Sequence, residues 1–155
     1  MLVTLWRHGE AGTATTDEIR PLTPRGTTSV QAAVIEWQTW LREQELPEAE
    51  TVRHSPLVRT TQTAALLQQC LGCTVVECDG LAPGALIQKP ESFVPSSGSH
   101  VVLVTHQPFV SQLIWNWLDD NALAPLMPGG WATLKVTAPL RGGATLIRAR
   151  TSIYE

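Results

Sequence analysis

The sequence has little charge and no long apolar run, and both absences narrow the functions open to it. Only 16% of its 155 residues are charged, and its formal net charge is −3. A slightly acidic chain is a poor candidate for non-specific nucleic-acid binding, although it can still hold a local basic pocket. No apolar stretch approaches the roughly 20 residues that a membrane-spanning helix needs. We therefore expect neither a nucleic acid nor a membrane among its partners.

Cysteine is scarce as well. The chain has Cys70, Cys73 and Cys78, an odd number, and Arg7 interrupts the only apolar run near its start. We expect no secretory signal, and hence reduced thiols and a cytoplasmic location. Cys70 and Cys73 have the spacing of a redox or zinc motif, but no second Cys or His pair follows at zinc spacing. We therefore favour buried thiols over zinc binding, which remains an alternative.

Strand and helix signals alternate along the chain. Apolar and β-branched runs predict strands at 2–6, 51–55, 74–78 and 101–105, with two more at 131–136 and 144–150. Apolar residues at helical spacing predict three helices, which begin at Thr23-Pro24, at Ser55-Pro56 and after His106-Gln107-Pro108. The glycine- and proline-rich segment 79–100 predicts a long connection with one short helix near 85–88.

This alternation predicts an α/β fold. We expect a single three-layer domain over 1–155, because 43% hydrophobic content supplies one real core at this length. Its central sheet is mostly parallel, with an antiparallel C-terminal edge and helices on both faces.

Basic side chains recur where predicted strands end. Arg7 and His8 follow the first strand, His106 follows the strand 101–105, and Arg59 lies one turn into the second helix. The carboxyl ends of parallel strands form the ligand-binding edge of open α/β sheets, and crossover handedness places the first and fourth strand ends there. Arg59 opposes the helix dipole, which costs up to about 1 kcal/mol unless an anion offsets it. Guanidinium forks match phosphate oxygens, so the pattern predicts a phosphate pocket.

Four groups of motifs, in order and spacing, carry a resemblance to a known family: Arg7-His8-Gly9, Arg20-Pro21-Leu22-Thr23, Ser55-Pro56 with Arg59-Thr60 and Gln62-Thr63-Ala64, and His106-Gln107-Pro108. In these motifs nearly the whole chain resembles the histidine phosphatase superfamily. Its short length and its second and fourth motifs are similar to the SixA-type phosphohistidine phosphatase branch. The resemblance implies a phosphoglycerate mutase-like fold and neither metal nor other cofactor.

The resemblance also implies roles for matching residues. His8 would be the nucleophile, passing through a phosphohistidine intermediate, while Arg7, Arg59 and His106 would hold the phosphoryl oxygens. The chemistry agrees, because imidazole has a neutral, nucleophilic form at neutral pH and a backbone carbonyl near Gly9 could fix its tautomer.

Two further residues, Arg20 and Gln107, join Gly9 as weaker candidates for substrate binding. No motif of the sequence identifies a general acid. Larger members of the superfamily protonate the leaving oxygen with an acidic residue, and the candidates here have no motif support: Glu10, Asp17, Glu18 and Asp79. Because a phosphoramidate nitrogen is readily protonated, this gap favours phosphohistidine or an activated aryl phosphate over sugar phosphates.

The sequence therefore predicts a metal-independent phosphatase acting on phosphohistidine in a partner protein, such as a histidine phosphotransfer domain of a signalling relay. The short chain lacks a large cap, so an open pocket suits a phosphorylated side chain. Two alternatives remain open: a small-molecule phosphomonoesterase or mutase of the same superfamily, and a phosphate-recognition module without turnover.

Overall fold

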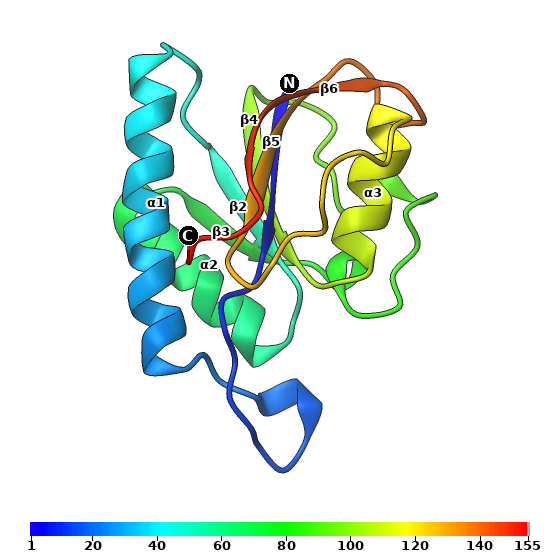
Figure 1. Ribbon diagram of the computed structural model, residues 1–155. Coiled ribbons are helices and arrows are strands. Elements are labelled where there is room, and N and C mark those ends of the chain that lie inside the picture. Colours follow the sequence, from blue (N-terminus) through cyan, green and yellow to red (C-terminus); the bar gives the residue numbers. More distant parts are fainter. Residues whose placement is uncertain (155) are drawn as a thin grey trace.

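The computed structural model describes residues 1–154 and contains a six-stranded sheet in the order β3-β2-β4-β1-β5-β6 (Figure 1). The strands are β1 (Leu2–Arg7), β2 (Thr51–His54), β3 (Thr74–Glu77), β4 (His100–Thr105), β5 (Trp131–Val136) and β6 (Ala144–Arg150). The first four pair in parallel, whereas β5 is antiparallel to both of its neighbours. The predicted mostly parallel sheet with an antiparallel C-terminal edge is confirmed.

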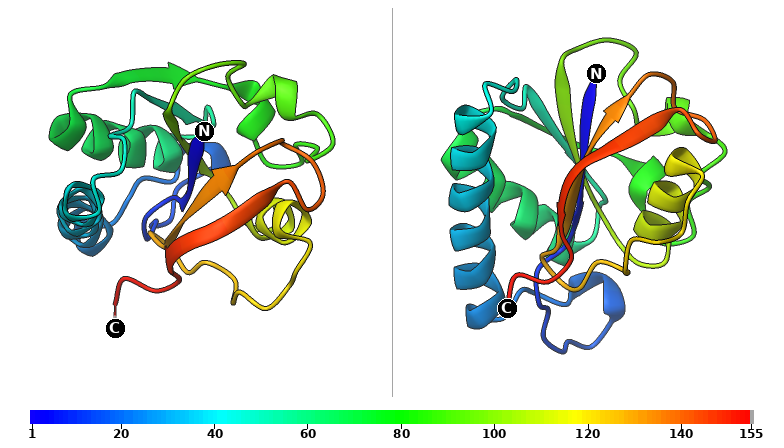
Figure 2. Two further views of the ribbon diagram at one scale, coloured as in Figure 1. Left: turned by 90° about the horizontal axis from the view of Figure 1, so that it is seen from above. Right: turned by 45° about the horizontal axis from the view of Figure 1, so that its top comes forward.

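Helices cover both faces of this sheet, as predicted. Figures 1 and 2 show α1 (Pro24–Glu43) and α2 (Val58–Leu71) on one side and α3 (Phe109–Leu118) on the other. Two hydrophobic clusters result, one on each side of the sheet. Successive residues of a strand point into the two clusters alternately: Leu5 packs in the cluster on the α3 side and Trp6 in the cluster under α1. Because both faces of β1 and β4 are buried, the sequences of these two strands are continuous apolar runs.

The start of α1 follows the sequence, but the start of α2 does not. The Thr23 hydroxyl oxygen accepts a hydrogen bond from the Gly26 N–H, and Pro24 opens the helix. Ser55 was expected to cap α2, but the capping position is Leu57, and the helix begins at Val58. The physical reason is tertiary: the Ser55 hydroxyl lies 2.7 Å from a ring nitrogen of His106.

The long connection between β3 and β4 also differs from expectation. The helix predicted at 85–88 is wrong, and short 3-10 helices occur instead at Asp79–Leu81 and Pro90–Ser92. Gly84, directly before this segment, has a positive φ of 84° and turns the backbone away from helical geometry at its start. Leu81 and Phe93 are fully buried in the α3-side cluster and fix the path of this connection. No helix within residues 1–154 is long and apolar enough to cross a membrane.

Candidate active site

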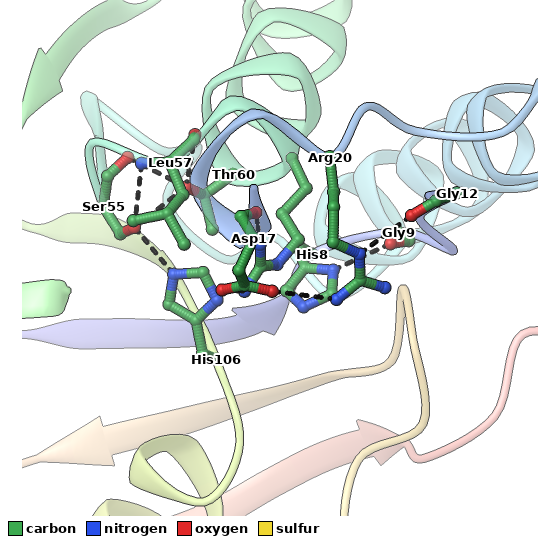
Figure 3. A network of polar contacts seen from close by, with 10 residues as sticks. His8, Gly9, Gly12, Asp17, Arg20, Ser55, Leu57, Thr60 and His106 are labelled. Carbon is green, nitrogen blue, oxygen red and sulfur yellow. Dashed lines mark hydrogen bonds and ion pairs between the residues drawn. The ribbon is translucent and has the colours of Figure 1, made fainter. Parts of the chain in front are cut away.

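The first and fourth strands place both predicted histidines at one edge of the sheet. Arg7 ends β1 and pairs with Thr105, the last residue of β4, so His8 and His106 leave the sheet side by side. Their ring centroids are 5.3 Å apart (Figure 3). Residues almost a hundred positions apart in sequence are thus brought together by strand order alone.

His8 is held in one tautomer by its own backbone. Its Nδ1 lies 2.8 Å from the Gly9 carbonyl oxygen, which can only accept, so Nδ1 carries the hydrogen. Nε2 therefore keeps its lone pair. The Gly9 N–H donates to the Thr63 hydroxyl of α2, 3.0 Å away. A Cβ at Gly9 would approach Val30 Cγ2 to 2.8 Å, so a larger residue here would have to displace the Val30 side chain.

His106 presents a buried ring nitrogen that has no partner among the described residues. Its Nε2 is 2.7 Å from Ser55 Oγ, which accepts a hydrogen bond from the Leu57 N–H at 3.3 Å. The Ser55 hydroxyl can direct its hydrogen to Nε2, and in that tautomer Nδ1 of His106 carries the ring hydrogen. Among the described residues, this buried Nδ1 has no hydrogen-bond partner. A buried donor of this kind suits an oxyanion.

Two guanidiniums complete the arrangement. Arg7 donates from Nη1 to the Leu126 carbonyl at 3.0 Å, and Arg59 donates from Nη1 to the Asp17 carbonyl at 2.8 Å. The Nε atoms of Arg7 and Arg59 are buried and have no hydrogen-bond partner within residues 1–154. Burial and the neighbouring Arg59 both lower the pKa of Arg7. Two neighbouring cations with unused donors favour binding of a polyvalent anion.

The same surroundings keep both histidines neutral. Burial lowers the pKa of His8 to about 4, opposed by the Gly9 carbonyl and assisted by Arg59 and Arg7. Burial, His8 and Arg59 lower the pKa of His106 to about 3. At neutral pH, His8 thus has a nucleophilic nitrogen and His106 has a neutral N–H donor.

The weaker candidates lie around this centre. Arg20 donates from Nε to the Gly12 carbonyl at 2.8 Å and pairs from Nη1 with Asp17 Oδ1 at 3.1 Å. Gln107 donates to the Leu126 carbonyl at 3.1 Å, the same oxygen that Arg7 uses. Gln107 therefore lies beside Arg7 and shares its hydrogen-bond acceptor. Substrate contact by Arg20, Gln107 and Gly9 stays a prediction.

Sequence reasoning gave Ser55 no role at the site and gave Asp17 only a role without motif support. Ser55 lies in a quoted motif but was interpreted as a helix cap, so the motif was the signal that could have identified it. Asp17 was one of four unsupported candidates for a general acid, and it pairs with both Arg59 and Arg20. An exposed loop carboxylate has no periodicity, so no sequence pattern indicates this position. Glu10, another candidate acid, instead pairs with Arg25.

Metal-ligating residues do not gather at the site. Within residues 1–154, no group of three or more His, Cys, Asp or Glu side chains is placed to hold a metal ion. The three cysteines are free and half-buried, and Cys70 donates to the Gln38 side-chain oxygen.

Solved structures share this fold over almost its full length. The protein histidine phosphatase SixA, solved with tungstate, matches with a TM-score of 0.80 and 22% identity, covering 97% of each chain. A protein assigned to SixA from Nakamurella multipartitia matches at 0.74 and 27% identity, covering 96% of this chain and 94% of the other. A third, from Agrobacterium tumefaciens, matches at 0.79 and 19% identity, covering 97% of each. The sequence itself matches no protein-family model and no curated protein.

The fold is therefore that of the histidine phosphatase superfamily, the phosphoglycerate mutase-like α/β architecture that the motifs implied. The three structural neighbours reported above carry the SixA name, and the predicted resemblance to the SixA-type branch is confirmed.

Proposed function

We propose that this chain is a metal-independent phosphatase that removes the phosphoryl group from phosphohistidine in a partner protein. The observation that carries the proposal is the pair of buried imidazoles, 5.3 Å apart, beside Arg7 and Arg59, whose buried Nε atoms have no partner among the described residues. One imidazole has a free lone pair and the other a free N–H, so the two can take different roles.

The first step is attack by His8. Its Nε2 lone pair forms a bond to phosphorus, and the bond from phosphorus to the substrate nitrogen breaks. Charge on the transferring phosphoryl oxygens is stabilised by donors already in place on Arg7, Arg59 and His106. Water then attacks the phosphorylated His8 and releases phosphate. The Gly9 carbonyl stabilises the cationic ring of that intermediate through the Nδ1 hydrogen bond.

The structural relatives support this assignment. The SixA structure with the highest TM-score among the three compared holds tungstate, a tetrahedral oxyanion that resembles phosphate. The three free thiols, Cys70, Cys73 and Cys78, are consistent with a reducing compartment, and we place the reaction in the cytoplasm.

A macromolecular substrate is favoured over a small metabolite by the rim of the site. The side chains of Asp17 and Arg20 at this rim are 55% and 37% exposed, so a phosphorylated side chain on another protein can approach them from solvent. We therefore propose a histidine phosphotransfer domain, or a similar phosphorylated protein, as the partner.

The test is dephosphorylation of a histidine phosphotransfer domain labelled on its histidine, in the presence of EDTA. We expect loss of label with release of inorganic phosphate, and no loss with the His8→Ala variant. A parallel panel of sugar and glycerate phosphates addresses the phosphomonoesterase or mutase alternative, which strong turnover of one metabolite would favour. Stabilisation by inorganic phosphate in a thermal melt, without hydrolysis of any substrate, would instead indicate a phosphate-recognition module.

A further inference from the structure

Asp17 extends a carboxylate over the mouth of the candidate site. It opens the 3-10 helix Asp17–Ile19 in the loop between β1 and α1. In Figure 3 its carboxylate lies between His106 and Arg20, in front of His8. The side chain of Asp17 is 55% exposed, yet it pairs with Arg59, whose side chain is only 7% exposed. Asp17 is therefore the described acidic residue that joins the buried site to solvent.

Asp17 uses the donors that a phosphoryl group would need. Its Oδ2 is 3.2 Å from Arg59 Nη2, and its Oδ1 is 3.1 Å from Arg20 Nη1. A phosphoryl oxygen bound by the same guanidinium nitrogens would compete with this carboxylate. Because the ion pair is solvent-exposed on one side, exchanging it costs little free energy.

The charge state of Asp17 rules out one role and suggests another. Hydrogen bonds from Arg20 and Arg59 hold the pKa of the Asp17 carboxyl below its usual value. Asp17 is therefore anionic at neutral pH and is a poor proton donor to a leaving group. An anion at the mouth instead favours a leaving group that already carries a proton and a positive charge.

We propose that Asp17 determines leaving-group specificity, an inference that rests on the proposed function. The phosphoryl group displaces the carboxylate from Arg59, and the carboxylate then accepts a hydrogen bond from the protonated ring nitrogen of the substrate phosphohistidine. The substrates it favours are N-phosphorylated imidazoles in their cationic form. The negative charge of Asp17 disfavours a phenolate or alkoxide, on which negative charge develops as the bond breaks.

This role balances the reaction without a general acid. His8 Nε2 supplies the electron pair for the new bond to phosphorus, and the pair of the broken bond stays on the substrate nitrogen. The substrate imidazole, protonated on its other nitrogen, leaves as neutral imidazole. Water then adds to phosphorus as the bond to His8 breaks, giving dihydrogen phosphate and neutral His8. No proton donor is needed in either step, in agreement with the missing acid.

The test compares two substrates in the full-length protein with the variant Asp17→Asn. Phosphoimidazole carries the favoured leaving group, and p-nitrophenyl phosphate leaves as a phenolate. We expect Asp17→Asn to lower kcat/KM for phosphoimidazole by about 10- to 100-fold, the usual range for a lost charged hydrogen bond. For p-nitrophenyl phosphate, kcat/KM should stay constant or rise. Glu43→Gln is the control, since it removes the same charge from an exposed position at the C-terminal end of α1 and should change neither rate.

Two outcomes would overturn the inference while leaving the proposed function intact. One is an equal loss, or no loss, with both substrates in Asp17→Asn. The other is weaker binding of inorganic phosphate by the variant in a thermal melt, which would make Asp17 a positioning residue for Arg59. Displacement predicts tighter phosphate binding in Asp17→Asn. If the wild-type protein hydrolyses no phosphohistidine and no phosphoimidazole, the proposed function itself fails.

Discussion

Two buried histidines stand at opposite ends of the same strand, and their surroundings differ. His100 opens β4, and both of its ring nitrogens are paired, Nδ1 with the Pro47 carbonyl at 2.7 Å and Nε2 with Thr4 Oγ1 at 2.8 Å. His106 follows β4, and its Nδ1 has no partner among the described residues. Burial lowers the pKa of both rings. A shifted pKa alone therefore does not distinguish a structural histidine from a candidate catalytic one.

The distinguishing feature is the unused donor. Around His100, the hydroxyl of Thr4 continues to Thr133 Oγ1 at 2.8 Å, to which the Trp37 indole N–H donates at 3.1 Å. Every polar group of that network has a partner, as expected for a network that stabilises the fold. Around His106, three buried nitrogens have no partner within residues 1–154: Arg7 Nε, Arg59 Nε and His106 Nδ1. This contrast predicts that variants at one end of β4 affect turnover and variants at the other end affect stability.

The largest effect is expected at His8. His8→Ala removes the proposed nucleophile, and kcat/KM for phosphohistidine should fall by at least about 10⁴-fold. The melting temperature should stay the same or rise, because a desolvated side chain is removed. Steady-state kinetics with a phosphorylated histidine phosphotransfer domain checks the loss of turnover, and a thermal melt checks the melting temperature. Undiminished turnover by a folded His8→Ala protein would exclude His8 as the nucleophile.

The next effect is expected at Arg59. Arg59→Ala removes a guanidinium that we place on the phosphoryl oxygens, and kcat/KM should fall by about 10²- to 10³-fold. Arg42→Ala is the matched control, since Arg42 forms only an exposed ion pair with Glu48 at the end of α1. Its kcat/KM should stay within about twofold of wild type. Equal losses in the two variants would show that overall charge, and not the position of Arg59, matters.

His100 should show the opposite pattern. His100→Leu leaves the Pro47 carbonyl and the Thr4 hydroxyl without their imidazole partner, at a cost of about 1–3 kcal/mol. For a chain of this length, that corresponds to a decrease in Tm of roughly 3–10 °C. We expect kcat/KM per folded molecule to stay within about twofold of wild type. A tenfold loss of turnover without loss of Tm would contradict the division between the two ends of β4.

The smallest effect concerns pH and stability. The pKa of His8 is about 4 in the folded protein and near 6.5 in the unfolded chain. As the pH falls, the unfolded chain therefore binds this proton before the folded protein does. Stability is then fully present above the unfolded pKa and declines as pH falls from about 6.5 toward 4. We expect wild type to lose about 1–2 kcal/mol more than His8→Ala between neutral pH and about pH 5, measured by urea unfolding. Identical losses would show that His8 is not buried as a neutral ring.

Much of this fold follows from local sequence patterns. The continuous apolar runs predicted β1 and β4 because both strands are buried on both faces, and the Thr23-Pro24 pair predicted the start of α1. The start of α2 was wrong because the Ser55 hydroxyl contacts His106, a residue far away in sequence. The helix expected at 85–88 was wrong because Gly84 and two buried apolar side chains determine the path of that connection.

For the site, the sequence predicted that the two histidines lie at one edge of the sheet, but it did not predict all of the contacts around them. The rules for crossover connections predicted that the first and fourth strands end at the same edge of the sheet. Only the structure shows that β1 and β4 are neighbours, which brings His8 and His106 together. The ion pair of Asp17 with Arg59 depends on how one exposed loop folds over the sheet edge. No periodicity constrains such a loop, so only the structure identifies it.

In the proposed mechanism, His8 carries the phosphoryl group during turnover. Its most direct test is rapid quenching of the wild-type protein with a phosphotransfer domain labelled on its phosphohistidine, followed by mapping of the labelled residue. We expect an acid-labile label on His8 that forms and decays at the rate of turnover. A label on any other residue, or single-turnover release of phosphate with no labelled protein at any time point, would contradict it.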